Sequence, residues 1–70
     1  MKYAVIYEKT STGYSACIPD IPGCVAAGAT LAETAKLIRG AVELHLETMR
    51  EDGDSIPKPT TIADYVAVPA

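Results

Sequence analysis

The residues that could do chemistry in this chain are few, and the first of them is its only histidine, His45. A histidine acts as a general base when a partner orients it and a nucleophile or substrate lies close by. His45 instead falls between Val42 and Met49 on a stripe of apolar residues at helical spacing. We therefore predict a partly buried histidine at the margin of the core, and no catalytic residue in the chain.

Two cysteines, Cys17 and Cys24, are the next candidates. With Asp20 or His45 they could be imagined as zinc ligands, but six residues separate them, which is not a paired zinc-ligand spacing, and a structural site needs four ligands. The chain begins MKYAVIYEKT, without the architecture of a signal peptide, so we expect a cytoplasmic protein with reduced thiols. We predict that both thiols act as small apolar side chains, and that no metal or other cofactor is bound.

The carboxylates do not form an obvious catalytic group. A two-metal nuclease needs several carboxylates that hold two ions about 4 Å apart. Glu8 lies at the far end of the first predicted strand, Asp64 begins the last one, and Glu43 and Glu47 fall on the polar face of the predicted helix. These positions do not converge, so we predict ordinary surface charges and a protein that is not an enzyme.

The charge balance argues against a protein that binds nucleic acid by itself. The formal net charge is -3, and phosphate contacts need clustered basic residues. A mildly acidic protein suits a basic partner, although the same charge can simply maintain solubility. The apolar runs are too short to span a membrane. The basic residues are scattered over the sequence: Lys2, Lys9, Lys36, Arg39, Arg50 and Lys58.

The 70 residues predict a single domain, 1–70, that opens with three strands. Residues 2–8 and 14–18 are rich in strand-forming residues and flank a turn, so they predict an antiparallel hairpin. Residues 25–28 predict a third, short strand. Apolar residues alternate onto both faces of the first strand, so we expect both faces to be covered. The two sets are Tyr3, Val5 and Tyr7 on one face, and Ala4 and Ile6 on the other.

An unusual segment separates the second and third strands. Two prolines exclude a helix there and remove two hydrogen-bond donors from any strand ladder. The following glycine is free to adopt a positive φ. We predict an ordered structural bend, in which the aspartate could also contact a partner. Its defining residues are Pro19, Asp20, Pro22 and Gly23.

A long helix is predicted from residue 31 to about residue 51. Thr30 is a suitable N-cap residue, Glu33 has capping-box spacing, and Gly53 suits the position after the helix end. One face of this helix carries an apolar stripe at steps of three and four residues. Its members are Leu31, Ala35, Ile38, Val42, His45 and Met49.

After the helix, residues 55–60 predict an extended connector and residues 62–68 a final strand, with Asp64 on the same face as two valines. The fold class is therefore α+β, in the order β-β-β-α-β, with one long helix packed on one face of a small sheet. So short a chain has a thin core, and we expect a homodimer or tetramer. Two leucines of the predicted helix, Leu37 and Leu44, lie beside its polar face. They contact a partner protein, contact a second copy of the chain, or pack under the connector. The interface candidates are Leu37, Leu44, Tyr65, Val66 and Val68.

These features together resemble the HicB-like antitoxin family, over nearly the whole chain. The family's fold is a partial ribonuclease-H-like β-β-β-α-β arrangement that associates with itself. The resemblance implies one half of a type II toxin–antitoxin pair, whose partner is a small basic ribonuclease that cleaves mRNA. The residues that carry it are Gly13-Tyr14, Ile18-Pro19-Asp20-Ile21-Pro22-Gly23-Cys24, Gly28-x-Thr30, Glu51-Asp52-Gly53 and Ile56-Pro57-Lys58-Pro59.

Many family members continue into a C-terminal DNA-binding module, whereas this sequence ends at Ala70. The resemblance is thus to the short form, and we expect no direct binding to nucleic acid. Two functions follow as hypotheses. One is an antitoxin that binds and neutralises a toxin ribonuclease. The other is a stand-alone homo-oligomeric domain that binds or regulates another protein without a toxin partner, and the neighbouring gene would distinguish the two.

Overall fold

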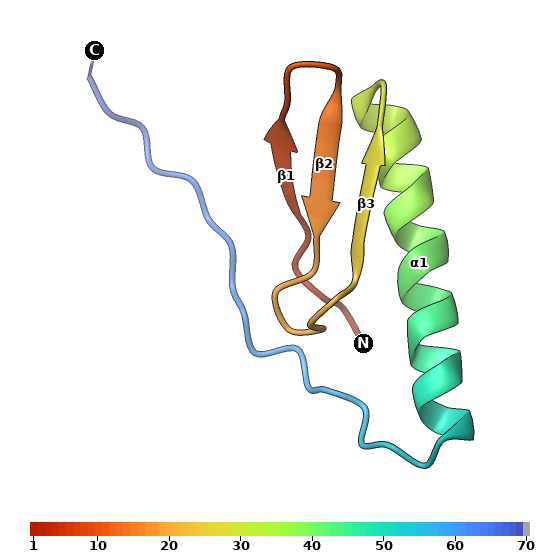
Figure 1. Ribbon diagram of the computed structural model, residues 1–70. Coiled ribbons are helices and arrows are strands. Elements are labelled where there is room, and N and C mark those ends of the chain that lie inside the picture. Colours follow the sequence, from red (N-terminus) through yellow and green to blue (C-terminus); the bar gives the residue numbers. More distant parts are fainter. Residues whose placement is uncertain (70) are drawn as a thin grey trace.

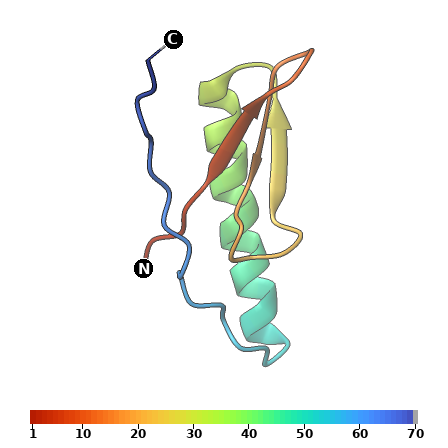
Figure 2. The same cartoon turned by 90° about the vertical axis from the view of Figure 1, so that its left-hand side faces the viewer.

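The computed structural model describes residues 1–69 and confirms the α+β class. Within these residues the elements are β1 (Ile6–Lys9), β2 (Tyr14–Cys17), β3 (Val25–Gly28) and α1 (Leu31–Glu51). The strands form an antiparallel sheet in the order β1-β2-β3, and α1 runs alongside one of its faces (Figures 1 and 2).

The first strand is shorter and later than predicted. Its ladder with β2 runs from Ile6, opposite Cys17, to Lys9, opposite Tyr14. Residues before Ile6 would have to pair with residue 18 and beyond, where the chain already turns into the bend. The hairpin itself is confirmed, and its turn is closed by the Thr10 N–H, which donates to the Gly13 carbonyl at 2.8 Å.

The residues that share the helix side of the sheet follow from the strand register. Ala16 pairs with Tyr7 on one side and with Ala26 on the other, so these three point toward α1. The helix packs mainly against β3 and secondarily against β2, so it lies off-centre. The opposite face, with Ile6 and Val25, borders an open hollow of about 410 Å³. The prediction that both faces of the first strand are covered is therefore wrong for residues 1–69.

The bend between β2 and β3 is held by its own backbone. The Ile18 N–H donates to the Cys24 carbonyl at 3.1 Å, and the Cys24 N–H donates to the Ile21 carbonyl at 3.1 Å. The Ile21 N–H in turn donates to Ile18 at 3.0 Å. Gly23 has a φ of 83°, a conformation that side chains with a Cβ rarely adopt. These bonds turn the side chain of Ile21 inward.

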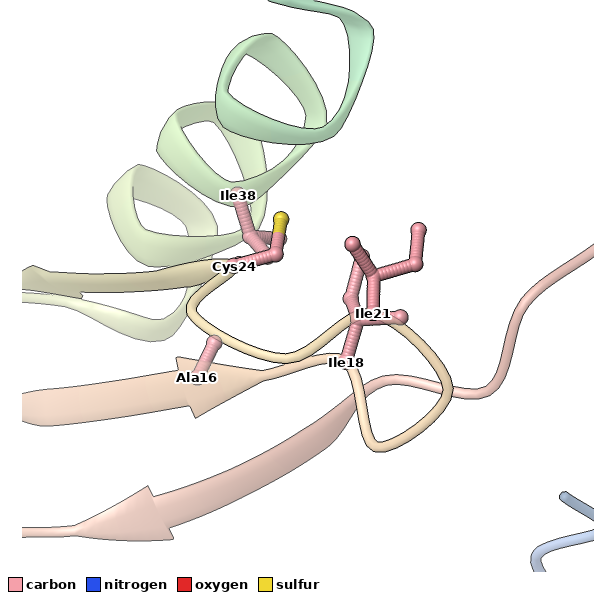
Figure 3. Packing of buried hydrophobic residues seen from close by; sticks show 5 residues of the cluster. All are labelled: Ala16, Ile18, Ile21, Cys24 and Ile38. Carbon is pink, nitrogen blue, oxygen red and sulfur yellow. The ribbon is translucent and has the colours of Figure 1, made fainter. Parts of the chain in front are cut away.

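The bend supplies most of the hydrophobic core. Ile21 is only 1% exposed, and it belongs to one buried cluster with Ile18, Cys24 and Ile38 of α1 (Figure 3). Ala16 of β2 completes the buried cluster. Three of these five core residues therefore come from the bend, which contributes more fully buried apolar side chains than the strands do.

The helix begins and ends as predicted. The Glu33 N–H donates to Thr30 Oγ1 at 3.1 Å, and Glu33 Oε1 accepts from the Ala29 N–H at 3.3 Å. At the other end, the N–H groups of Gly53 and Asp54 donate to the carbonyls of residues 50 and 49, which is a Schellman motif. Both ends thus satisfy backbone groups that a helix leaves unpaired.

The buried stripe of α1 is rotated slightly from the prediction. Leu31 is exposed, whereas Thr34 is fully buried and donates its hydroxyl to the Thr30 carbonyl at 2.8 Å. A Cβ on Gly28 would lie 2.8 Å from Thr34 Oγ1. The missing side chain at Gly28 therefore allows the start of α1 to approach β3 closely. The rest of the predicted stripe is covered at least in part: Ala35, Ile38, Val42, His45 and Met49.

The predicted final strand is absent. Residues 62–69 are extended but pair with no strand of residues 1–69, and they lead away from the sheet on the side of β1 (Figure 1). We call residues 62–69 the C-terminal arm. A strand requires a partner as well as a suitable sequence, and the arm has no such partner among residues 1–69. The ribonuclease-H-like arrangement consequently stays a prediction.

Candidate functional site

The residues whose side chains could take part in catalysis or metal binding lie apart from one another. Cys24 is buried in the core, and this burial raises the pKa of its thiol. Cys17 borders the hollow on the opposite face of the sheet. His45 is half-buried on α1. Among residues 1–69, no three His, Cys, Asp or Glu side chains come together in a way that could hold a metal ion.

Most carboxylates are exposed, as expected, and they do not converge. Glu8 is on β1, Glu43 and Glu47 are on α1, and Asp64 is in the arm. Residues 1–69 include no helix with the length and apolar character needed to cross a membrane. The interface candidates from the sequence, in contrast, include large apolar side chains that are exposed.

Asp20 is the exception among the carboxylates, because it holds the connector that follows α1. Its carboxylate accepts hydrogen bonds from the N–H and hydroxyl groups of both Thr60 and Thr61, at 2.7 to 3.1 Å. These bonds, chiefly the one from the Thr61 N–H, lower the pKa of Asp20. We call this group the Asp20 clamp. The sequence placed Asp20 in a bend but gave no signal for its partners, which lie 40 residues away.

A second contact holds the connector closer to the helix. The hydroxyl of Tyr3 donates to the carbonyl of Pro57, so the connector is tied to the N-terminal segment as well as to the bend. Ile56 and Pro57 are partly buried there, whereas residues 58–69 are exposed. The connector is thus anchored at two points, and only the arm beyond Thr61 projects freely.

The two helix leucines singled out from the sequence lie on an uncovered side of α1. Leu37 is 47% exposed and Leu44 is 66% exposed. The connector does not bury them, which decides against the packing alternative. The two are seven positions apart in the sequence, so they lie on nearly the same line along the helix.

Leu44 belongs to a surface with an apolar floor and an acidic rim. A shallow hollow of about 470 Å³ beside it is lined by Met49, His45, Asp52 and Asp54, among others. We call this surface the Leu44 patch. Residues 41–54 contain five acidic residues and one basic residue, a formal charge of −4, while the chain as a whole carries -3. The negative charge of the protein is therefore concentrated in the segment that carries this patch, and two of the five acidic residues, Asp52 and Asp54, line the hollow itself.

The remaining interface candidates all lie in the arm. Tyr65, Val66 and Val68, together with Ile62, are between 73% and 98% exposed. These side chains form a contiguous apolar segment without cover from residues 1–69, as is typical of interaction sites. The structure thus separates the five candidates into two surfaces, with the leucines on α1 and the other three in the arm.

Comparisons with known proteins agree with this picture of a binding protein. A sequence profile described as the HicB_like antitoxin of bacterial toxin-antitoxin system matches residues 3–70. A solved structure of a "HicA3 and HicB3 toxin-antitoxin complex" contains a chain that is 33% identical. It superposes with a TM-score of 0.73, over 86% of this chain and 70% of that chain.

Two relatives known by sequence extend the comparison. An uncharacterized 14.9 kDa protein from the rep-hol intergenic region of Haemophilus phage HP1 is 39% identical over 69 residues. The match covers 99% of this chain and 52% of that protein, so the chain spans about half the length of the phage relative. A UPF0150 protein of Archaeoglobus fulgidus is 37% identical over 59 residues, covering 80% of this chain and 86% of the relative. By its family profile and its fold, the chain belongs to the HicB-like antitoxins of bacterial toxin–antitoxin systems.

Proposed function

We propose that this chain neutralises a small basic toxin that cleaves mRNA, by binding the toxin and covering the surface through which RNA enters. The action is stoichiometric inhibition without catalysis. The observation that carries the proposal is the Leu44 patch, which combines an exposed leucine with two aspartates and lies in the acidic segment 41–54.

Charge and apolar surface have separate roles in such a complex. A ribonuclease presents a positive surface to RNA, and an acidic inhibitor can occupy that surface, since complementary charge speeds the encounter. Charge alone does not make a tight complex, which also requires an apolar anchor that is buried on binding. Leu44 supplies the anchor, while Asp52 and Asp54 supply part of the charge.

The test is co-expression with the small basic protein encoded beside this gene. We expect the neighbour to arrest growth alone, and this chain to restore growth and to co-purify with it. If the neighbour is harmless, or stays toxic in the presence of this chain, the antitoxin function is wrong and a stand-alone binding domain takes its place.

The Leu44→Asp variant examines the patch itself. We expect it to weaken toxin binding by about 2 kcal/mol or more, because a charge replaces the central apolar anchor. Isothermal titration calorimetry measures this loss. The matched control is Leu31→Asp, which places the same charge on an exposed leucine at the other end of α1. Equal affinities for the two variants would place the toxin elsewhere.

A further inference from the structure

Gly40 lies in the interior of α1 without a reason that residues 1–69 supply. A glycine is less favourable than an alanine inside a helix, because its backbone loses more conformational freedom on folding. Gly23 and Gly53 adopt a positive φ, and Gly28 allows Thr34 to approach β3 closely. Gly40, in contrast, has a negative φ, and an added Cβ would meet nothing within 4 Å. The contacts of the described chain therefore do not explain why this position is glycine.

The neighbours of Gly40 on the helix surface give it the form of a notch. Gly40 lies three positions after Leu37 and four before Leu44, so the three lie on one face of α1. With Ala41 they make a set of four that matches the hole which receives one side chain of a facing helix. The two leucines and Gly40 are exposed, and no other segment of residues 1–69 covers this side of α1 (Figure 1). We call these four residues the Gly40 notch.

A row of like charges follows the same side of the helix. Glu43, Glu47 and Glu51 are exposed and four positions apart, so neighbouring members of the row repel each other. Glu51 lies in the last turn of α1, where the helix dipole also disfavours negative charge. Arg50 offsets only part of this repulsion. The row therefore does not stabilise the free helix in proportion to the charge it carries.

These features together indicate a binding surface. Sequence choices that disfavour the free fold are typical of functional sites, and here a glycine, two uncovered leucines and like charges lie close together. Their charge favours a basic partner over a second copy, because each further copy brings another net charge of -3. Leu44 and Ala41 also line the hollow of the Leu44 patch. One partner can therefore cover the patch and the notch together.

We propose that the toxin inserts an apolar side chain from one of its helices into the Gly40 notch, with its basic groups beside Glu43 and Glu47. This inference rests on the proposed function and adds how the partner is recognised. The missing Cβ of Gly40 lets the inserted side chain reach the backbone of α1. Gly40 is thus a specificity residue, which costs the free helix stability and gives the complex its close fit.

The proposal predicts that one substitution changes stability and affinity in opposite directions. Gly40→Ala should raise the melting temperature of the free chain, because alanine favours the helix. The same variant should weaken toxin binding about tenfold, because its methyl group overpacks the notch. Gly40→Leu fills the notch and should weaken binding about a hundredfold. The matched control, Ala32→Leu, enlarges another exposed residue of α1 and should bind like the unaltered chain.

The row of glutamates can be tested separately. The double variant Glu43→Gln and Glu47→Gln keeps the size of both side chains and removes their charges. We expect slower association with the toxin and a weaker dependence of the association rate on salt, because fewer complementary charges steer the encounter. An association rate with the salt dependence of the unaltered chain would overturn the placement of the toxin's basic groups.

The experiment titrates each full-length variant with the purified small basic protein encoded beside this gene, by calorimetry. Circular dichroism measures the melting temperature of each free variant. If the unaltered chain does not bind the neighbour, the proposed function fails and the notch has no toxin to receive. If it binds, and Gly40→Leu binds as tightly as Ala32→Leu, only the notch is wrong.

Sedimentation of each variant alone identifies the other possible occupant. We expect Gly40→Leu and Ala32→Leu to have the same mass in solution as the unaltered chain. A loss of self-association in Gly40→Leu, without a loss in Ala32→Leu, would assign the notch to a second copy of the chain and overturn the proposal.

Discussion

The bend at residues 18–24 and the C-terminal arm are similar in sequence and opposite in structure. Both are short, contain proline and carry several apolar side chains. The bend buries its apolar residues almost completely, with Ile21 at its centre, whereas the arm leaves its own exposed. The Asp20 clamp joins the two segments, because its carboxylate belongs to the bend and its donors lie just before the arm.

The difference teaches that apolar composition alone does not bury a segment. The bend closes on itself with three backbone hydrogen bonds between residues 18, 21 and 24, and it is joined at both ends to paired strands. The apolar side chains of the bend are therefore directed into the core. The arm follows a connector held by the Asp20 clamp and by Tyr3, and among residues 1–69 no strand pairs with it.

The largest difference between the bend and the arm is expected in the free energy of unfolding, when an apolar side chain is truncated in each segment. Ile21→Ala should lower the free energy of unfolding by about 2–5 kcal/mol, because it leaves a cavity in the core. Ile62→Ala, at low protein concentration, should change it by less than about 0.5 kcal/mol. Urea denaturation measures both. Equal losses at low concentration would show that the arm already packs within its own chain.

A substitution of Gly23 addresses the backbone of the bend. Gly23→Val should destabilise the fold by about 1–3 kcal/mol, since the φ of 83° is strained for a β-branched residue. The control is Gly40→Ala, in the middle of α1, where an added Cβ meets nothing within 4 Å. That variant should stabilise the protein by up to about 1 kcal/mol. An unchanged melting temperature for Gly23→Val would show that the bend does not need glycine.

The smallest expected effect concerns the link between the two segments. Asp20→Asn removes the charge that accepts the four hydrogen bonds, so the amides of Thr60 and Thr61 should exchange faster with solvent, with little change in global stability. Amide hydrogen exchange followed by NMR measures this. Protection that is the same in the variant would show that the carboxylate does not hold the connector.

The pH dependence of the clamp has a definite sign. The pKa of Asp20 lies below its ordinary value of 3.8, chiefly because the Thr61 N–H donates to the ionised carboxylate. The clamp therefore stabilises the connector fully above that ordinary value, and loses this contribution as the pH falls through the lower folded-state pKa. The Asn variant should lack this dependence.

Much of the fold follows from local sequence. The ends of α1 are signalled by Thr30, Glu33 and Gly53, whose roles depend on hydrogen bonds within a few residues. The third strand and the hairpin were likewise predictable from alternation and turn residues. The bend was recognisable from its prolines and Gly23, because each restricts its own backbone.

Contacts between distant segments were decided only by the tertiary structure. Thr34 looks like an ordinary helix residue, and its complete burial depends on the close approach that Gly28 allows. The partners of Asp20 lie 40 residues along the chain, beyond any local pattern. The arm shows the same limit most clearly, because alternation at residues 62–68 determines which side chains share a face, whereas a strand also requires an edge to pair with. The sequence therefore determined that the arm can be a strand, and the three-dimensional arrangement decided that this chain alone does not make it one.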